Sequence, residues 1–95
     1  MVNFAIDCGY SLKTIEFLAS QGFSIKEKSN DGMNSLHYAC SQGKLDIVQY
    51  LLSRDVDPRD TDNEGELPSD FIDGKDSSKI ENLLQKRIDE LESKN

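Results

Sequence analysis

The chain has 95 residues, and its 18 Asp and Glu residues outnumber its 11 Lys and Arg residues, which gives a net charge of -7 and a sequence pI near 4.5. A phosphate backbone would be repelled overall, so nucleic acid is not expected as a partner. No apolar run approaches the roughly 20 residues that span a bilayer, so membrane insertion is not expected either. The acidic excess either steers a basic protein partner toward the chain or only keeps a small domain soluble.

The two cysteines, Cys8 and Cys40, form neither a CxxC pair nor a disulfide framework. Such usage predicts a reducing, intracellular location, in the cytoplasm. The first residues also lack the basic start and apolar core of a signal peptide.

A period of 33 residues organises the chain, because residues 14–32 align with residues 47–65 and a further step of 33 reaches a third copy. The aligned positions are Leu12 with Leu45, Ile15 with Val48, Leu18 with Leu51, Gly32 with Gly65, Ile47 with Ile80, and Leu51 with Leu84. Stacked repeats need about three units to bury a stable core. The period therefore predicts one stack made of the whole chain.

The first copy is cut short at its beginning. Ala5 and Gly9 align with Ala39 and Gly43 after one inserted residue, and no turn precedes them. We expect the chain to be a fragment of a larger protein that begins inside a repeat, with an exposed apolar end. The residues expected at that end are Phe4, Ile6 and Leu12. We accordingly expect a monomer, or weak self-association through the truncated N-terminal repeat.

The middle copy predicts two helices. Asn34 and Ser35 can cap a first helix that runs to Ser41, and Gly43 ends it. A second helix is expected over residues 45–53. Its predicted apolar stripe consists of Leu45, Val48, Leu51 and Leu52.

The second helix of the middle copy is followed by Asp55, where the first copy has Gly22. This position favours a left-handed backbone, which Gly adopts freely and Asp tolerates with some strain. Residues 57–65 then form a turn-rich span.

The third copy has Pro68 at the start of its expected first helix. It has Ser69 and Asp70 where the middle copy has Leu36 and His37. Polar replacements are typical of a terminal capping repeat, whose outer face meets water. Residues 77–91 then predict a long last helix, with its apolar positions at Ile80, Leu83, Leu84, Ile88 and Leu91.

No set of residues in the sequence supplies catalytic chemistry or a cofactor site. His37 is the single histidine, so no pair of histidines can bind a metal ion together. The acidic residues between Asp55 and Glu64 lack the spacing of a calcium-binding loop and are expected to form a solvated turn. We therefore expect no enzymatic activity, no metal and no cofactor.

The segment DGMNSLHYACSQGKLDIVQYLLSRDVDPRDTDNEG, residues 31–65, resembles one complete ankyrin repeat. Residues 34–37 stand at the family's Thr-Pro-Leu-His, Ala39 and Cys40 at its paired alanines, and Gly43 at its inter-helix glycine. The resemblance implies an all-α ankyrin-repeat solenoid of about three stacked helix-turn-helix repeats, the first truncated and the last a capping repeat. It implies a single domain, residues 1–95, with repeats at about 1–30, 31–63 and 64–91. In this family the histidine orders the turn.

The resemblance to ankyrin repeats also implies a function, which is protein–protein interaction through the turn tips and the exposed side of each first helix. The matching positions here are Asn30, Asp31, Met33, Tyr38, Ser41, Gln42, Asn63, Glu64 and Glu66. Tyr38 and Met33 beside acidic turn tips would form a patch able to anchor an interface. Alternatively, Tyr38 packs against the adjacent helix and Met33 is an incidental exposed side chain.

A second, less extensive resemblance involves the C-terminal ankyrin segment of long acyl-CoA-binding proteins, which are lipid carriers. It is based on SLHYAC, LDIV, the DP after the second helix, DNEG and the later LP. It implies that the parent protein carries acyl-CoA esters in the cytoplasm and that this segment docks it to partners.

Overall fold

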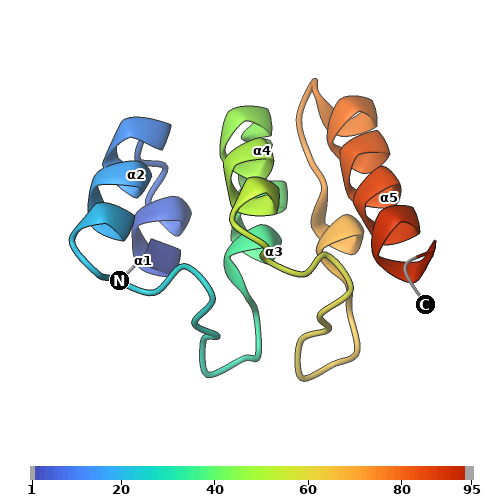
Figure 1. Ribbon diagram of the computed structural model, residues 1–95, viewed down its shortest axis with the longest axis horizontal. Helices are drawn as coiled ribbons and strands as arrows, with labels where there is room; N and C mark the ends of the chain where they lie inside the picture. The colour runs from blue at the N-terminus through green and yellow to red at the C-terminus, as the bar shows by residue number, and fades with distance from the viewer. Residues whose placement is uncertain (1, 94–95) are drawn as a thin grey trace.

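In the computed structural model, which describes residues 2–93, six helical elements form three pairs stacked side by side (Figure 1). The pairs are α1 (Val2–Asp7) with α2 (Leu12–Ser20), α3 (Ser35–Gln42) with α4 (Leu45–Ser53), and the 3-10 helix η1 (Pro68–Phe71) with α5 (Ser77–Ser93). Two long loops, residues 21–34 and 54–67, project from the same end of the stack (Figure 1). The predicted all-α stack of three repeats is confirmed.

The core runs through the stack because each helix pair buries its apolar side against its neighbours. Contacts join α1 to α3 and α3 to η1 along one row, and α2 to α4 and α4 to α5 along the other. We call α1, α3 and η1 the inner row, and α2, α4 and α5 the outer row. The core side chains are Val2, Ala5, Ile6, Ile15, Ile25, Leu36, Ala39, Cys40, Ile47, Val48, Leu51, Val56, Ile80 and Leu84.

The apolar stripe predicted for α4 is partly wrong. Val48 and Leu51 are fully buried as expected, but the third core residue of this helix is Ile47. Leu45 and Leu52 are only partly buried, because each lines an open groove facing Leu83 of α5. The stripe therefore turns toward α3, and the two outlying leucines flank it.

The exposed apolar end predicted for the first repeat is also partly wrong. Phe4 is 64% exposed, but Ile6 is completely buried and Leu12 is half-buried. Ile6 is buried because α1 is a complete small helix that packs on both α2 and α3. The exposed large apolar residues of the first repeat are Phe4, Tyr10, Phe17 and Phe23.

The start of α3 has the predicted cap, and His37 completes it. The side chain of Asn34 accepts the backbone N–H of His37 at 3.1 Å, and the Asn34 N–H donates to His37 Nδ1 at 3.1 Å. The other ring nitrogen, Nε2, lies 2.9 Å from the Glu66 carbonyl oxygen. Because a carbonyl only accepts, Nε2 carries the proton and Nδ1 is the acceptor. His37 therefore orders the turn and also binds the next loop.

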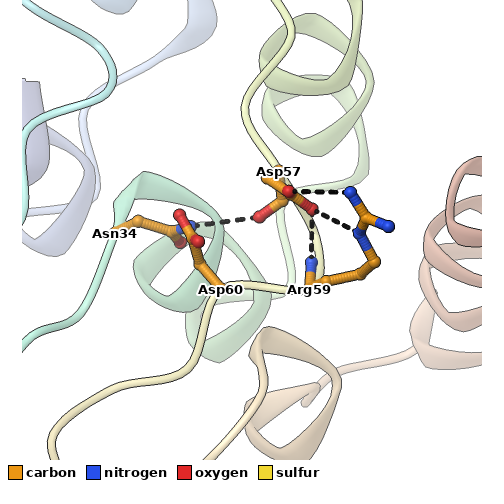
Figure 2. Close-up of polar contacts among 4 residues, drawn as sticks. All are labelled: Asn34, Asp57, Arg59 and Asp60. Atoms are coloured by element: carbon orange, nitrogen blue, oxygen red, sulfur yellow. Dashed lines mark hydrogen bonds and ion pairs between the residues drawn. The ribbon is translucent and has the colours of Figure 1, made fainter. Parts of the chain in front are cut away.

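Asn34 extends the same network to the loop that follows α4 (Figure 2). Its amide nitrogen donates to the Asp57 carbonyl oxygen at 3.3 Å and to Asp60 Oδ2 at 3.4 Å. Asp57 is in turn held by Arg59, whose backbone N–H and guanidinium both donate to its carboxylate. Burial alone would raise the pKa of Asp57, but these bonds outweigh it and the pKa lies below its usual value. The loop is thus anchored at two successive points.

Gly43 lies at a close approach between the middle and last repeats. It ends α3, as predicted, and its backbone is left-handed, with φ of 65°. A Cβ at this position would lie 2.5 Å from the Asp73 carbonyl oxygen, and the Asp73 N–H donates to the Cys40 carbonyl at 3.2 Å. The absence of a side chain therefore permits backbone-to-backbone contact between repeats.

No helix within residues 2–93 has the length and apolar character needed to cross a bilayer.

Replacing Leu51 with Ala should lower the free energy of unfolding by about 2 to 5 kcal/mol, because the side chain is fully buried and its removal leaves a cavity. Urea denaturation followed by circular dichroism measures the change. Leu51→Met, which keeps the volume, should cost less than about 1.5 kcal/mol. An alanine variant as stable as the wild type would show that Leu51 is not a core residue.

Gly43→Ala should destabilise the chain more than Gly9→Ala. Both glycines end the first helix of a repeat at positive φ, so each substitution incurs the left-handed backbone cost of about 1 to 2 kcal/mol. Only Gly43 faces a neighbouring backbone, whereas a Cβ at Gly9 meets nothing within 4 Å. Thermal melts of both variants measure the difference, and equal losses would rule out a steric role for Gly43.

Asp55→Gly should stabilise the chain by up to about 1 kcal/mol. Asp55 is the one non-glycine residue with positive φ, 65°, among those described. The substitution also removes a 3.1 Å ion pair with Arg87, but the Asp55 side chain is 73% exposed and such pairs contribute little. Asp55→Asn, which loses the charge but keeps a side chain, is the control. A loss of stability in the glycine variant, measured by urea denaturation, would contradict the prediction.

Candidate functional site

The two long loops each end in a tight turn, and the turns lie against one another. In the first, the Ser29 N–H donates to the Met33 carbonyl at 2.9 Å. In the second, 33 residues later, the Asp62 N–H donates to the Glu66 carbonyl at 3.0 Å. The turn tips are joined by Asn63, whose backbone N–H and side chain donate to the Asp31 and Asn30 carbonyls, both at 2.9 Å. The structure thus brings the turn-tip residues of the sequence prediction together.

The second turn is built around the carboxylate of Asp62. Its Oδ1 accepts the backbone N–H groups of Glu64 at 2.9 Å and Glu66 at 2.8 Å. These bonds, led by that from Glu66, hold the pKa of Asp62 below its usual value. Burial, followed by repulsion from Asp62 and Glu64, raises the pKa of Glu66. The turn therefore has a fixed backbone and a crowded set of carboxylates.

A cleft of about 290 Å³ lies between the two turns and the last repeat; we call it the second cleft. Met33 and Phe71 supply its apolar side chains. Its polar lining is Asp31, Asp62, Asn63, Glu64 and Glu66. Phe71 was missed by the sequence prediction, although it stands 33 residues after Tyr38 and the period could have identified it.

Tyr38 lines a different cleft, of about 260 Å³, between the first and middle repeats; we call it the first cleft. Its other lining residues are Asn3, Phe4, Asp7, Glu27 and Ser29, none of which the sequence prediction included. Tyr38 is half-buried and packs against the core with part of its side chain, as the second interpretation of this residue expects. Its role in an interface stays a prediction. Of the predicted set, five residues line the second cleft and Tyr38 lines the first, whereas Asn30, Ser41 and Gln42 line neither.

Two of the predicted residues already have partners within the chain. Ser41 Oγ donates to the Tyr38 carbonyl at 2.9 Å, inside its own helix. Gln42 Nε2 donates to the Asp7 carbonyl at 3.1 Å, across to α1. Their side chains therefore help to fix α3 and its contact with the first repeat.

Two buried titratable side chains of the described residues, His37 and Cys40, take part in the packing of the fold. Residues 2–93 contain no cluster of three or more His, Cys, Asp or Glu side chains placed to hold a metal ion. His37 is fully buried and lies edge-on to Phe71, with ring centres 5.5 Å apart. Burial raises the pKa of the Cys40 thiol to about 12, which makes it a poor nucleophile, and Cys8 is exposed and free. The surface is suited to binding, with apolar clefts rimmed by carboxylates.

Comparison with known proteins places these features in a family. Residues 18–72 match the family described as ankyrin repeats (many copies). The human protein phosphatase 1 regulatory subunit 27 is 40% identical over 63 residues, which cover 66% of this chain and 41% of that protein. The mouse ankyrin repeat domain-containing protein 63 is 35% identical over 54 residues, covering 57% of this chain and 14% of that protein.

A chain in a solved complex has the same fold over most of this protein. The complex is that of the predatory endopeptidase Bd0816 from Bdellovibrio bacteriovorus with the immunity protein Bd3460. The matching chain has a TM-score of 0.75 and 28% identity, over 90% of this chain and 45% of its own. The present chain thus spans less than half the length of each of these proteins. The 33-residue period, the capping role of His37 and the family match over more than half of the residues together show that this chain belongs to the ankyrin repeat family.

Proposed function

We propose that the chain is a non-catalytic binding module that engages a protein partner through the two turns and the inner row of helices. The observation that carries this proposal is the pair of neighbouring clefts, each of which combines apolar side chains with carboxylates. Interfaces commonly anchor on such partly exposed aromatic residues and Met with a polar rim. The turn tips are pre-organised by backbone hydrogen bonds, so a partner would not have to order them.

The partner that fits this surface is basic. The net charge is -7, and carboxylates line both clefts. A positively charged surface would be attracted to them, whereas nucleic acid would be repelled. Neither cleft contains an activated nucleophile with a base, which supports binding rather than catalysis.

The remaining expectations about the protein's context also stay proposals. Two free thiols fit a reducing cytoplasm. A single domain over residues 1–95 agrees with the continuous core, although Met1 and residues 94–95 lie outside the described residues.

Weak self-association through the first repeat would use Phe17 and Phe23, which are exposed, and not Ile6.

The relatives guide the choice of a first partner to test. The human relative is named as a regulatory subunit of protein phosphatase 1, so this phosphatase is the first candidate. The second sequence resemblance, to acyl-CoA-binding proteins, finds no support among the relatives described above.

The binding surface is tested with the double variant Met33→Ala, Tyr38→Ala. The immobilised wild-type chain captures proteins from a cell lysate, and mass spectrometry quantifies each one, including protein phosphatase 1. Capture of a specific partner should fall about tenfold or more in the double variant, because each substitution removes an apolar side chain from one cleft.

The control for this experiment is Gln49→Ala, which changes an exposed residue in the groove between α4 and α5. It should capture the same partner as well as the wild type does. Thermal melts establish that the double variant is folded at the temperature of capture. Equal capture by the folded double variant and the wild type would show that the partner binds elsewhere.

A further inference from the structure

The two clefts are repeat-equivalent sites. Phe4, Tyr38 and Phe71 follow one another at 34 and 33 residues, and the one extra residue matches the insertion in the first repeat. They stand at corresponding positions of α1, α3 and η1, the three members of the inner row. Phe4 and Tyr38 line the first cleft, and Phe71 lines the second. The inner row therefore presents a column of aromatic side chains, one from each repeat.

Carboxylates accompany this column in both clefts. Asp7 and Glu27 line the first cleft. The carboxylates of the second cleft are those of Asp31, Asp62, Glu64 and Glu66. Among the described residues, no Lys or Arg side chain lines either cleft. At Glu66 burial and the two neighbouring carboxylates raise the pKa, and a bound cation would offset this repulsion.

The grooves between two helices of the outer row have a different lining. The grooves between α4 and α5 are lined by Lys79, Lys86 and Arg87, with Glu90 as the one carboxylate among the described residues. The helices of the outer row carry acidic residues as well, so this contrast holds for the lining of the clefts and grooves and not for whole sides of the chain. A basic ligand is attracted to the clefts more strongly than to these grooves.

Asn3, which lines the first cleft, has an acceptor atom without a partner. The amide nitrogen of Asn3 donates to the Glu27 carbonyl at 2.7 Å, whereas its Oδ1 is buried and has no hydrogen-bond partner. Leaving a buried acceptor unpaired costs about 1 to 3 kcal/mol. Because this oxygen has almost no accessible surface, a donor from a bound molecule, such as a guanidinium or a backbone N–H, would satisfy it only after the Asn3 side chain turns toward the cleft.

The spacing of the clefts indicates the conformation of the ligand. Neighbouring packed helices lie about 8 to 10 Å apart, which sets the step from one cleft to the next. A polyproline II segment rises about 3.1 Å per residue with three residues per turn, so residues three apart lie on one side about 9 Å apart. A β-strand returns to the same side after about 7 Å, which is too short.

We propose that the two clefts together bind one basic segment of a partner protein in an extended, polyproline II-like conformation. Two apolar side chains three residues apart enter the two clefts, against Phe4 and Tyr38 in the first and against Met33 and Phe71 in the second. Lys or Arg side chains beside them pair with the carboxylates. This inference rests on the proposed function and specifies the ligand of the same surface.

The test uses the synthetic peptide Gly-Ser-Leu-Arg-Lys-Leu-Arg-Ser-Gly, titrated into the ¹⁵N-labelled chain. Amide shifts should change at Met33, Tyr38 and Glu66 and not along α5, and the affinity should fall as salt is added. Two matched peptides are the controls: one moves the leucines to two residues apart, and one replaces Arg and Lys by Glu. The first should bind about tenfold more weakly, and the second should not bind.

Chain variants complete the test. Phe4→Ala changes a residue that is 64% exposed, so it leaves the core intact, and it should weaken the peptide about tenfold. Gln49→Ala should leave the affinity unchanged. The inference is wrong if the parent peptide does not bind, if both leucine spacings bind equally, or if the shifts map to the groove between α4 and α5. If the peptide fails while partner capture still depends on Met33 and Tyr38, only the ligand assignment is lost and the proposed function stands.

Discussion

The buried imidazole of His37 is the contact on which the arrangement of the repeats depends. It receives the Asn34 N–H on one side and donates to the Glu66 carbonyl on the other, so a single ring connects the start of α3 to the end of the following turn. Phe71 packs edge-on against the same ring. A buried ring with both nitrogens paired avoids the cost of unsatisfied polar groups and allows little freedom of position. The location of the second cleft follows from this, since Glu66 and Phe71 both line it.

Other buried polar groups are also hydrogen-bonded at the start of α3, where they bind both neighbouring loops. Ser35 Oγ donates to the Ile25 carbonyl at 2.9 Å in the preceding loop, and Asn34 binds Asp57 in the following one. Asn34, Ser35 and His37 are all buried, which polar residues rarely are unless they are hydrogen-bonded. The start of α3 thus serves as the junction of three repeats. The apolar core supplies most of the stability, and these bonds select one register between repeats.

The sequence predicted the elements well because their signals are local. The cap at Asn34, the stop at Gly43 and the limits of α4 depend on neighbouring residues, and the structure agrees with each. Ile6 was predicted to be exposed because the first repeat was expected to be truncated, whereas its burial depends on contacts of α1 with α2 and α3. The clefts were missed for a related reason. Residues as distant as Asn3 and Tyr38 line one cleft only after the repeats stack, and Phe71 was overlooked although the period aligns it with Tyr38.

Different side chains of this surface stabilise the stack and remain available to a partner. Ser41 and Gln42, although they lie on the inner row, donate to carbonyls within the chain. Asp62 uses its carboxylate to fix the second turn, and Asn63 joins the two turn tips. The side chains that remain on this surface are the aromatic residues, Met33 and the carboxylates other than Asp62. A partner can displace water from these groups without breaking a bond that holds the fold, so binding and stability draw on different residues.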